Sequence, residues 1–482
     1  MGNLAQRMSA KAGGLADVSA SLVNALHKQG ARVHVALPNY AKMFAFERKE
    51  RWQNALEKVN RSLPEQRIHL AEDAAFYRRS EVYDSSANQN VALAFQREVI
   101  NHVIPQVQPD LIHCNDWMTG LIPAVAKHHG IRSLFTVHNI HTERLTLARM
   151  EDKGIDAEEF WNHCYFLNHP GSYGDAREQN PVDLLTTGIF CADHVNTVSP
   201  TFLSEVVDGN HDFVPEHIVH EIRQKDAHHC ASGILNAPDD SFDPETDPYL
   251  EVHFGADDHA SGKEKSKSLL QQRLGLPNNP NAPVLFWPSR LYPVQKGPQL
   301  LADILPQMME DYRHLGLQVA IIANGSFQGQ FHELVHRHQL RESVAVCDFS
   351  EALSHLGYAG SDFMLMPSRF EPCGLPQMVS PKYGTLTVAH DTGGIHDTVQ
   401  HLNVAAGTGN GFLFRHFDAG GLRWAIDEAL RFYQEPAETK NAHRSRIMLE
   451  AKETFNHETT ARAYIERYAE MLGTPVTATQ QD

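Results

Sequence analysis

The chain of 482 residues lacks the features that mark membrane, secreted or nucleic-acid-binding proteins. It contains no apolar run of the roughly 18 residues or more that a membrane-spanning helix requires. The N-terminal segment MGNLAQRMSAKAGG has no apolar core and therefore does not resemble a secretory signal. Basic residues are in deficit, because 42 Lys and Arg face 59 Asp and Glu and leave a net charge of −17. This balance argues against a nucleic-acid partner and against binding to an anionic membrane.

Cysteine is also scarce, with six residues scattered along the chain and no CxxC pair. This spacing indicates reduced thiols rather than a disulfide framework, and we expect a cytoplasmic location. Hydrophobic residues make up 42% and charged residues 21%, which is typical of globular proteins. Only histidine is unusually frequent, with 30 residues. The composition favours a soluble, acidic enzyme whose length fits two large domains or three ordinary ones.

Short apolar runs alternate with longer amphipathic stretches along most of the chain. The runs predict strands at 32–37, 110–114, 133–138, 194–198, 283–287, 318–323, 343–346, 363–366 and 385–389. The stretches predict helices at 15–29, 91–104, 202–207, 262–274, 299–312 and 421–433. Such alternation is typical of βαβ units, and we therefore predict an α/β fold with doubly wound parallel sheets.

A segment rich in Pro and Asp, residues 236–260, has no helical period and divides the series in two. We predict an N-terminal domain over 1–235, a C-terminal domain over 236–455, and a final helix and tail over 456–482 that returns to the first domain. Two doubly wound domains that face each other place a cleft at their strand ends, where such sheets bind ligands.

A Gly-Gly helix start, Lys11-Ala-Gly-Gly-Leu-Ala-Asp17, is the first candidate site. Free backbone N–H groups and the helix dipole favour an anion there, and Lys11 adds a positive charge suited to a phosphate. An ordinary turn has the same composition. Because the GxGxxG spacing is absent, the segment does not indicate a nicotinamide cofactor.

Two further candidate anion sites follow predicted strands. In the segment 367–377, PSRFEPCGLPQ, Pro and Gly predict a loop and a helix that begins near Gly374, and Glu371 can accept hydrogen bonds from hydroxyls. Asp391-Thr-Gly-Gly-Ile395 repeats the arrangement after the next strand. Two ordinary strand–helix loops are the alternative interpretation.

Ser289-Arg-Leu-Tyr-Pro-Val-Gln-Lys-Gly297 also follows a predicted strand. Its Arg290 and Lys296 can neutralise the charge of a departing diphosphate, although a solvated loop with two unrelated cations has the same sequence. His332-Glu-Leu-Val-His336 matches the HExxH zinc spacing, but its polar neighbours predict a solvent-facing helix. We therefore predict no metal site and no cofactor.

Together, these segments resemble the bacterial glycogen synthase and plant starch synthase family, retaining glucosyltransferases of the GT-B fold. KAGGLADV, HCNDW with TGL, FTVHN, VNTVSPTF, GILNAPDDSFDPETDPYL, SRFEPCGLPQ, KYGTL and DTGGIHDTV are similar, in this order, to motifs of that family. The resemblance covers nearly the whole chain, and its last three segments are the most specific.

The resemblance implies a GT-B fold with two Rossmann-like domains and a cleft between them. It implies transfer of glucose from ADP-glucose to the non-reducing end of an α-1,4-glucan, with retention at the anomeric carbon. No nucleic acid, membrane or metal is implied, and the oligomeric state stays open. The implied catalytic residues are Asp116, His138, Arg290, Lys296 and Glu371.

The same resemblance implies contacts with the donor. Lys11, Gly13 and Gly14 face its phosphates, and Asp17 belongs to the same motif. The first domain contributes His138 and Asp116 to the glucose, while Asn236 lies near the hinge. The remaining contacts come from the second domain and involve Cys373, Gly374, Leu375, Thr392 and Gly393.

The chain departs from the family pattern at four places. Only MGNLAQRMSA precedes Lys11, so we expect the first domain to lack a central strand, either because the natural start lies upstream or because the chain is altered. Met118 replaces a His, and the segment around Lys296 gains one residue. Ala237 follows Asn236 where the family has Gly, and residues 141–177 diverge.

Three other functions stay open on the sequence. The first is a GT-B transferase with a different donor or acceptor, which a donor and acceptor panel decides. The second is a catalytically silent glucan-binding relative, which glucan co-sedimentation without turnover would indicate. A zinc peptidase is the remaining alternative, and bound zinc would support it.

Overall fold

The computed structural model describes residues 15–39, 63–76 and 88–476. The chain divides into two compact units: unit 1 comprises Met1–Asn236 and His457–Asp482, and unit 2 comprises Ala237–Asn456. Two points on the chain, after Asn236 and after Asn456, therefore connect the units.

Unit 2 is built on a six-stranded sheet in which every pairing is parallel. Its order is β11-β10-β9-β12-β13-β14. The chain thus moves outward from β9 to β11 and then returns to the other side of β9 for β12. The strands are β9 (Val284–Trp287), β10 (Gln318–Ile322), β11 (Val344–Cys347), β12 (Phe363–Met366), β13 (Leu386–His390) and β14 (Gly411–Phe414).

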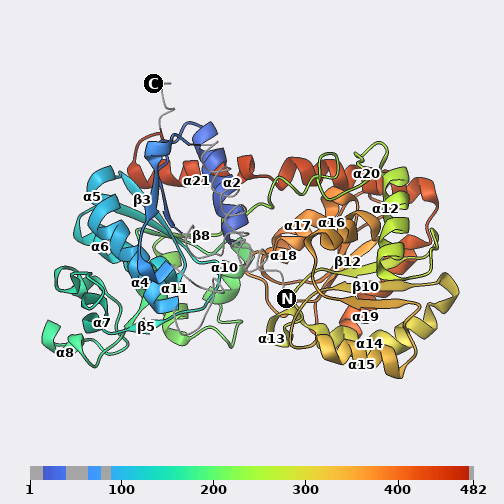
Figure 1. Cartoon of the computed structure of the whole chain (residues 1–482), viewed down its shortest axis with the longest axis horizontal. Coiled ribbons are helices and arrows are strands. Elements are labelled where there is room, and N and C mark those ends of the chain that lie inside the picture. Colours follow the sequence, from blue (N-terminus) through green and yellow to red (C-terminus); the bar gives the residue numbers. More distant parts are fainter. Residues whose placement is uncertain (1–14, 40–62, 77–87, 477–482) are drawn as a thin grey trace. The chain divides into compact units, whose positions relative to one another are not determined.

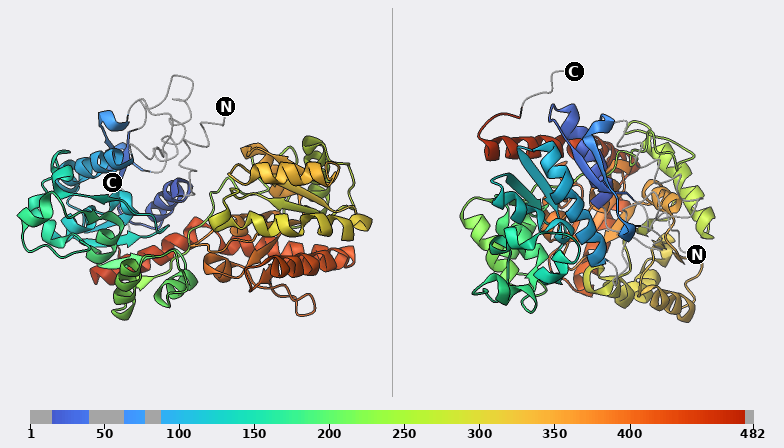
Figure 2. Two further views of the ribbon diagram at one scale, coloured as in Figure 1. Left: turned by 90° about the horizontal axis from the view of Figure 1, so that it is seen from below. Right: turned by 60° about the vertical axis from the view of Figure 1, so that its left-hand side comes forward.

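Helices cover both faces of this sheet (Figures 1 and 2). Alternate residues of a strand point to opposite faces. Leu285 and Trp287 of β9 therefore enter one core, which also contains Leu301, Phe331 and Ile426 from α14, α15 and α19. The unit's helices are α12 (His259–Leu274), α13 (Pro293–Lys296), α14 (Pro298–Asp311), α15 (Gln328–Arg337), α16 (Glu351–Gly360), α17 (Pro376–Val379), α18 (Gly393–Thr398), α19 (Ala419–Tyr433) and α20 (Ala437–Thr454).

The opposite face of the unit 2 sheet forms a second core. Val284 and Phe286 of β9 pack there with Leu270 of α12, Tyr358 of α16 and Met448 of α20. Because both faces are buried, the strands are short continuous apolar runs rather than alternating ones.

Unit 1 contains the parallel sheet β3-β4-β7-β8 and, apart from it, the parallel pair β1-β2 and the antiparallel pair β5-β6. The bounds are β1 (Val35–Pro38), β2 (Ile68–Ala71), β3 (Leu111–Asn115), β4 (Arg132–Thr136), β5 (Arg144–Leu145), β6 (Val182–Asp183), β7 (His194–Asn196) and β8 (Ala231–Ser232). The question whether a strand precedes Lys11 lies outside the described residues.

Two cores also flank the four-stranded sheet of unit 1. Phe135 of β4 enters the larger core, and its neighbour Leu134 packs on the other face against Leu26 and Tyr464. These last two belong to α2 and α21, which lie side by side (Figure 1). The helices are α2 (Leu15–Lys28), α4 (Asn88–Glu98), α5 (Ile104–Val107), α6 (Ile122–His128), α7 (Leu147–Glu151), α8 (Tyr173–Arg177), α9 (Leu184–Cys191), α10 (Pro200–Val207), α11 (Glu216–Ala227) and α21 (His457–Leu472).

The final helix belongs to unit 1 although it is last in the sequence. Tyr468 OH lies 2.7 Å from His113 Nδ1 of β3, and Asn196 Nδ2 of β7 donates to Tyr464 OH at 2.8 Å. These bonds tie α21 to two strands of the sheet. None of the helices in the described ranges combines the length and apolar character needed to cross a bilayer.

Candidate functional site

The order of the unit 2 sheet creates a switch point between β9 and β12. The chain leaves these adjacent strands toward opposite sides of the sheet. In open α/β sheets, a crevice for ligands forms outside the carboxyl ends of the strands at such a point. Here β9 is followed by residues 288–292 and α13, and β12 is followed by the loop 367–375. These two segments carry six of the predicted site residues, Arg290, Lys296, Glu371, Cys373, Gly374 and Leu375.

Lys296 and Glu371 meet at this switch point and form an ion pair through Nζ and Oε2. Their side chains are only 12% and 8% exposed, so the pair is largely removed from water. The Ser368 hydroxyl donates to the same Glu371 oxygen at 3.1 Å. The arrangement fixes one ammonium group and one carboxylate at the carboxyl end of the sheet.

The start of α18 is tied to the same loop. Gly394 N donates to the Glu371 carbonyl at 2.9 Å. A Cβ on Gly394 would lie 2.0 Å from the Cys373 carbonyl oxygen, so only glycine permits this approach. Thr392 and Gly393 are buried immediately before it. The structure therefore brings the two predicted loops, after β12 and after β13, into direct contact.

The side chain of Gln377 stabilises the turn at Gly374 through hydrogen bonds. Its Nε2 donates to the carbonyls of Cys373 at 2.8 Å and Gly374 at 3.2 Å. Gly374 has φ of 74°, in the left-handed region. The helix predicted near Gly374 begins at Pro376, after the half-buried Leu375.

Arg290 differs from its predicted partner Lys296. Its side chain is exposed, and it forms no ion pair with any residue that the structure describes. Its backbone carbonyl accepts a hydrogen bond from Tyr292 N at 2.9 Å, which bends the chain after β9. The guanidinium is therefore positioned at the strand end with its donors available to an anion.

In unit 1, Asp116 follows β3 in a strained backbone conformation. Its φ of 57° and ψ of 176° lie in a region that is essentially restricted to glycine and costs about 1–3 kcal/mol. The conformation directs the carboxylate to His138 N, which donates at 2.7 Å, and to Asn139 Nδ2, which donates at 3.1 Å. Burial raises the pKa of Asp116 to about 7, despite these two donors.

His138 lies between two side-chain amides. Asn236 Nδ2 donates to Nδ1 at 3.3 Å, so Nε2 carries the proton and donates to Asn115 Oδ1 at 3.0 Å. Burial and, to a smaller extent, the nearby His113 lower the pKa of His138 to about 3, so the imidazole is neutral at physiological pH. The buried Asn236 Oδ1 has no partner among the described residues. Asp116, His138 and Asn236 thus form one polar cluster, in which His138 is neutral and the Asp116 carboxyl is about half protonated at about pH 7.

Several predicted site residues fall outside the description. Lys11, Gly13 and Gly14 lie in the undescribed N-terminal segment. Asp17 lies on α2, but its side chain is outside the described part. The predicted capture of phosphates by Lys11 therefore stays a prediction.

The sequence reasoning missed four residues that support the two clusters. Ser368 and Gln377 stand within quoted motifs, and Asn115 and Asn139 directly precede Asp116 and follow His138. Their position beside motif residues is the only sequence signal for their roles. The HExxH segment lies on α15, where His332 and His336 are exposed as predicted and Glu333 pairs with Arg337.

Comparison with protein families gives two matches that together span most of the chain. Residues 6–220 match the starch synthase catalytic domain, and residues 282–431 match the glycosyl transferases group 1 family. The chain is 33% identical to the glycogen synthase of Exiguobacterium sibiricum over 88% of this chain and 89% of that protein. It is 32% identical to the glycogen synthase of Bacillus subtilis over 88% of both.

Solved structures with similar folds include the catalytic domain of starch synthase IV from Arabidopsis thaliana, bound to ADP and acarbose. The TM-score is 0.78 at 27% identity, with 97% of each chain covered. A sucrose-phosphate synthase from Thermosynechococcus elongatus aligns with a TM-score of 0.56 at 16% identity, over 94% of this chain and 92% of that one. The second likeness shows the fold alone.

Proposed function

The chain belongs to the glycogen and starch synthase family of glycosyltransferases, and on that premise we propose that it extends an α-1,4-glucan with glucose from ADP-glucose. The predicted family, the α/β GT-B fold class and the assignment as a glycosyltransferase are confirmed. The residue roles, the acceptor end and the cytoplasmic location belong to the proposal. ADP and acarbose are bound to the related starch synthase IV, and they support a nucleotide-sugar donor and a glucan acceptor.

The observation that carries the proposal is the Lys296–Glu371 pair at the β9–β12 switch point. A diphosphate needs positive charge, and Lys296 of α13 with the exposed Arg290 before it supplies two cations after β9. Glu371 accepts hydrogen bonds from sugar hydroxyls, and the backbone of Cys373, Gly374 and Leu375 adds donors. Thr392 and Gly393 line the same end of the sheet.

In unit 1, the cluster of Asp116, His138 and Asn236 suits the glucose of the donor. His138 and Asn236 are uncharged and burial favours the protonated form of Asp116, which matches hydroxyl groups rather than phosphates. Lys11 with Gly13 and Gly14 contributes to the phosphates in the proposal. We assign the acceptor side to unit 1 and the donor side to unit 2.

The proposed reaction retains the configuration at the anomeric carbon. The 4-hydroxyl of the terminal glucose attacks C1 on the face from which ADP departs. The bond from C1 to the phosphate oxygen breaks, a bond from C1 to O4 forms, and the hydroxyl proton passes to the departing phosphate. The protein contributes positioning and stabilisation of the developing charge on the diphosphate, without a covalent intermediate.

A transfer assay tests this function. The full chain is incubated with radiolabelled ADP-glucose and glycogen, and label in precipitated polymer is measured, with UDP-glucose as the second donor. We expect labelled polymer, with ADP-glucose preferred. Absence of label, when a competent synthase labels the same glycogen, would contradict the proposal, and retention of the chain on glycogen without transfer would indicate a silent glucan-binding relative.

A further inference from the structure

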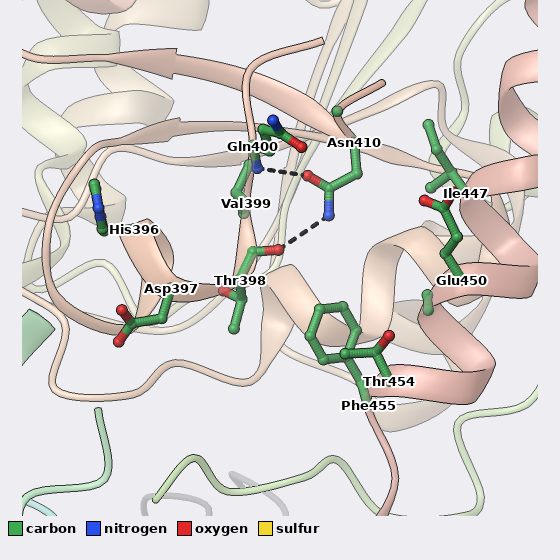
Figure 3. A pocket seen from close by; sticks show the side chains of 12 residues that line it. His396, Asp397, Thr398, Val399, Gln400, Asn410, Ile447, Glu450, Thr454 and Phe455 are labelled. Carbon is green, nitrogen blue, oxygen red and sulfur yellow. Dashed lines mark hydrogen bonds between the residues drawn. The ribbon is translucent and has the colours of Figure 1, made fainter. Parts of the chain in front are cut away.

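A hollow of about 250 Å³ lies between α18 and α20 in unit 2, and the polar groups of its wall bind one another (Figure 3). The Asn410 side chain accepts a hydrogen bond from Gln400 N at 2.7 Å and donates one to the Thr398 carbonyl at 3.0 Å. Arg446 Nη1 donates to Glu450 Oε2 at 2.7 Å. These polar groups are satisfied without a ligand. A group of basic side chains in unit 1 differs in this respect.

Four basic side chains lie at the point where β1 and β2 begin, and we call them the basic cluster: Arg32, His34, Arg67 and His69. The two strands are parallel, and their first residues are opposite each other. His34 and Arg67, which directly precede β1 and β2, therefore enter the pair side by side, and His69 follows in β2. Like charges on neighbouring strands destabilise the pairing of those strands.

The two histidines of the basic cluster are in direct contact. His34 Nδ1 lies 3.0 Å from His69 Nε2, and the stacked rings have centroids 5.4 Å apart and planes that differ by 20°. A hydrogen bond between two ring nitrogens requires one of them to lack a proton, so at most one of the two rings is charged while they are bonded. The outer nitrogens, His34 Nε2 and His69 Nδ1, have no hydrogen-bond partner among the described residues and are available to a ligand.

No carboxylate in the part of the chain that the structure describes forms an ion pair with the basic cluster. Burial, the neighbouring His69, and the positive charges of Arg32 and Arg67 lower the pKa of His34, and burial lowers the pKa of His69. Arg67 Nη1 is buried and has no hydrogen-bond partner in the same part of the chain. A buried charged donor without a partner destabilises the fold, and an anion that accepts its hydrogen bond removes this cost.

The basic cluster is separate from the groups assigned to glucose transfer. His34 and Arg67 precede β1 and β2, so the cluster lies at the amino ends of two parallel strands. Asp116 and His138 instead follow β3 and β4, at the carboxyl ends of their strands. Because the chain as a whole carries a net charge of −17, a concentration of cationic groups at one place is a local exception.

We propose that the basic cluster binds one oxyanion, either inorganic phosphate or the phosphate group of a small monoester. The guanidinium groups of Arg32 and Arg67 present paired N–H donors that match phosphate oxygens, and their two positive charges balance a phosphate dianion. The histidine pair supplies one outer N–H when it is neutral and two when one ring takes up a proton. The exposed Arg32 leaves one side of the site open to solvent, so that a ligand can enter.

Isothermal titration calorimetry of the full chain with sodium phosphate tests the site, at pH 7 in chloride buffer of constant ionic strength. Saturating ADP is present, so that the proposed donor site is occupied. We expect one phosphate per chain, with the affinity reduced about tenfold in Arg67→Gln and about threefold in the exposed Arg32→Gln. Arg341→Gln is the matched control and should keep the parent's affinity, because Arg341 is an exposed arginine of unit 2 without an ion pair among the described residues.

The midpoint of thermal unfolding separates this site from a structural role of Arg67. Without phosphate, Arg67→Gln should unfold at or above the parent's midpoint, because the substitution removes an uncompensated charge. Phosphate should then raise the midpoint of the parent more than that of the variant. A variant that is less stable than the parent by the same amount with and without phosphate would overturn the proposal. Equal phosphate affinity in the parent and both cluster variants, or no binding to the parent, would also overturn it.

Titration with methyl phosphate identifies the source of the anion. Binding as tight as that of inorganic phosphate supports a site for a monoester, and binding of inorganic phosphate alone supports a site for the free ion. Both measurements use the chain without a sugar donor. A chain that binds phosphate at the basic cluster but transfers no glucose therefore supports this site and contradicts only the proposed function.

Discussion

The two units hold their strand-end polar groups in opposite electrostatic forms. In unit 2, Lys296 and Glu371 form one nearly buried ion pair. In unit 1, burial brings the pKa of Asp116 up to about 7 and that of His138 down to about 3, and Asp116 has no cationic partner among the described residues. The strongest shifts in unit 1 thus favour neutral forms.

The two units therefore differ in the charge state of their strand-end groups, although the residue types are similar. Both units offer a carboxylate and a nitrogen base after a parallel strand. A paired charge keeps its ionisation when buried, and an unpaired one loses it to desolvation. In the proposed function, the paired set contacts the diphosphate and the unpaired set contacts sugar hydroxyls.

Glu371→Gln is expected to have the largest effect, because it leaves Lys296 without its counter-ion and removes the negative charge that Ser368 also contacts. We expect the rate of glucose transfer to fall about 10²–10³-fold, equivalent to about 3–4 kcal/mol of transition-state stabilisation. Steady-state kinetics with ADP-glucose measures this loss.

Glu342→Gln is the control for that variant, since Glu342 is exposed in the same unit and forms no ion pair with a described residue. If the Glu371→Gln variant had unchanged kinetics, the Lys296–Glu371 pair would have no role in glucose transfer. An equal fall in the transfer rate of Glu371→Gln and Glu342→Gln would also contradict a specific role of the pair.

Gly394→Ala tests the contact between the two loops that frame the unit 2 pair. Its Cβ would meet the Cys373 carbonyl oxygen at 2.0 Å, so backbone must move, at a cost of about 3 kcal/mol. Gly329→Ala in α15 is the matched control, because nothing lies within 4 Å of its Cβ, and a gain of up to about 1 kcal/mol is expected. Thermal unfolding of both variants measures the difference, and equal midpoints would refute the tight approach.

The sequence pattern predicted the central strands of the unit 2 sheet accurately. The predicted strand 363–366 is β12 residue for residue, and β9 and β10 differ from prediction by one residue each. These strands are apolar throughout because both faces are buried, which makes them visible in sequence. The short strand β14 was missed, since its four residues follow a glycine-rich loop.

Helix α20 was also missed, for a different reason. It buries His443 and Arg444 where an amphipathic helix has apolar residues, and Arg444 Nη2 donates to Asp362 Oδ1 at 2.9 Å. Because Arg444 pairs with a residue 82 positions away, the hydrophobic periodicity of α20 does not show that this side is buried. The Lys296–Glu371 pair spans 75 positions, so the motifs supplied both residues but not their contact.

Acid stability sharpens the comparison, because a buried neutral histidine of unit 1 takes up a proton when the chain unfolds in mild acid. Burial lowers the pKa of His113 to about 4, below its unfolded value of about 6.5. A depressed folded pKa means that the unfolded state binds more protons, so His113 stabilises the fold above pH 6.5 and loses this effect as the pH falls toward 4. Between pH 7 and pH 5 the loss is about 2 kcal/mol.

His113→Gln should therefore flatten the pH dependence of urea unfolding by this amount. The variant should still show some dependence of the unfolding free energy on pH, because burial also lowers the pKa values of His138 and His194. His338→Gln serves as the control, because His338 is exposed in unit 2. A parent and a His113→Gln variant with the same slope would contradict the neutral state of this histidine.

The smallest expected effect concerns Asp116, whose shift has the opposite sign. A folded pKa of about 7, above the unfolded value, means that the folded state retains a proton between about pH 4 and 7, and this stabilisation is lost as the pH rises through 7. From pH 6 to pH 8 the parent should lose about 1 kcal/mol relative to Asp116→Asn, whose amide does not titrate. Urea unfolding at the two pH values measures this difference. A constant difference would show that Asp116 is ionised throughout, and both units would then hold charged carboxylates at their strand ends.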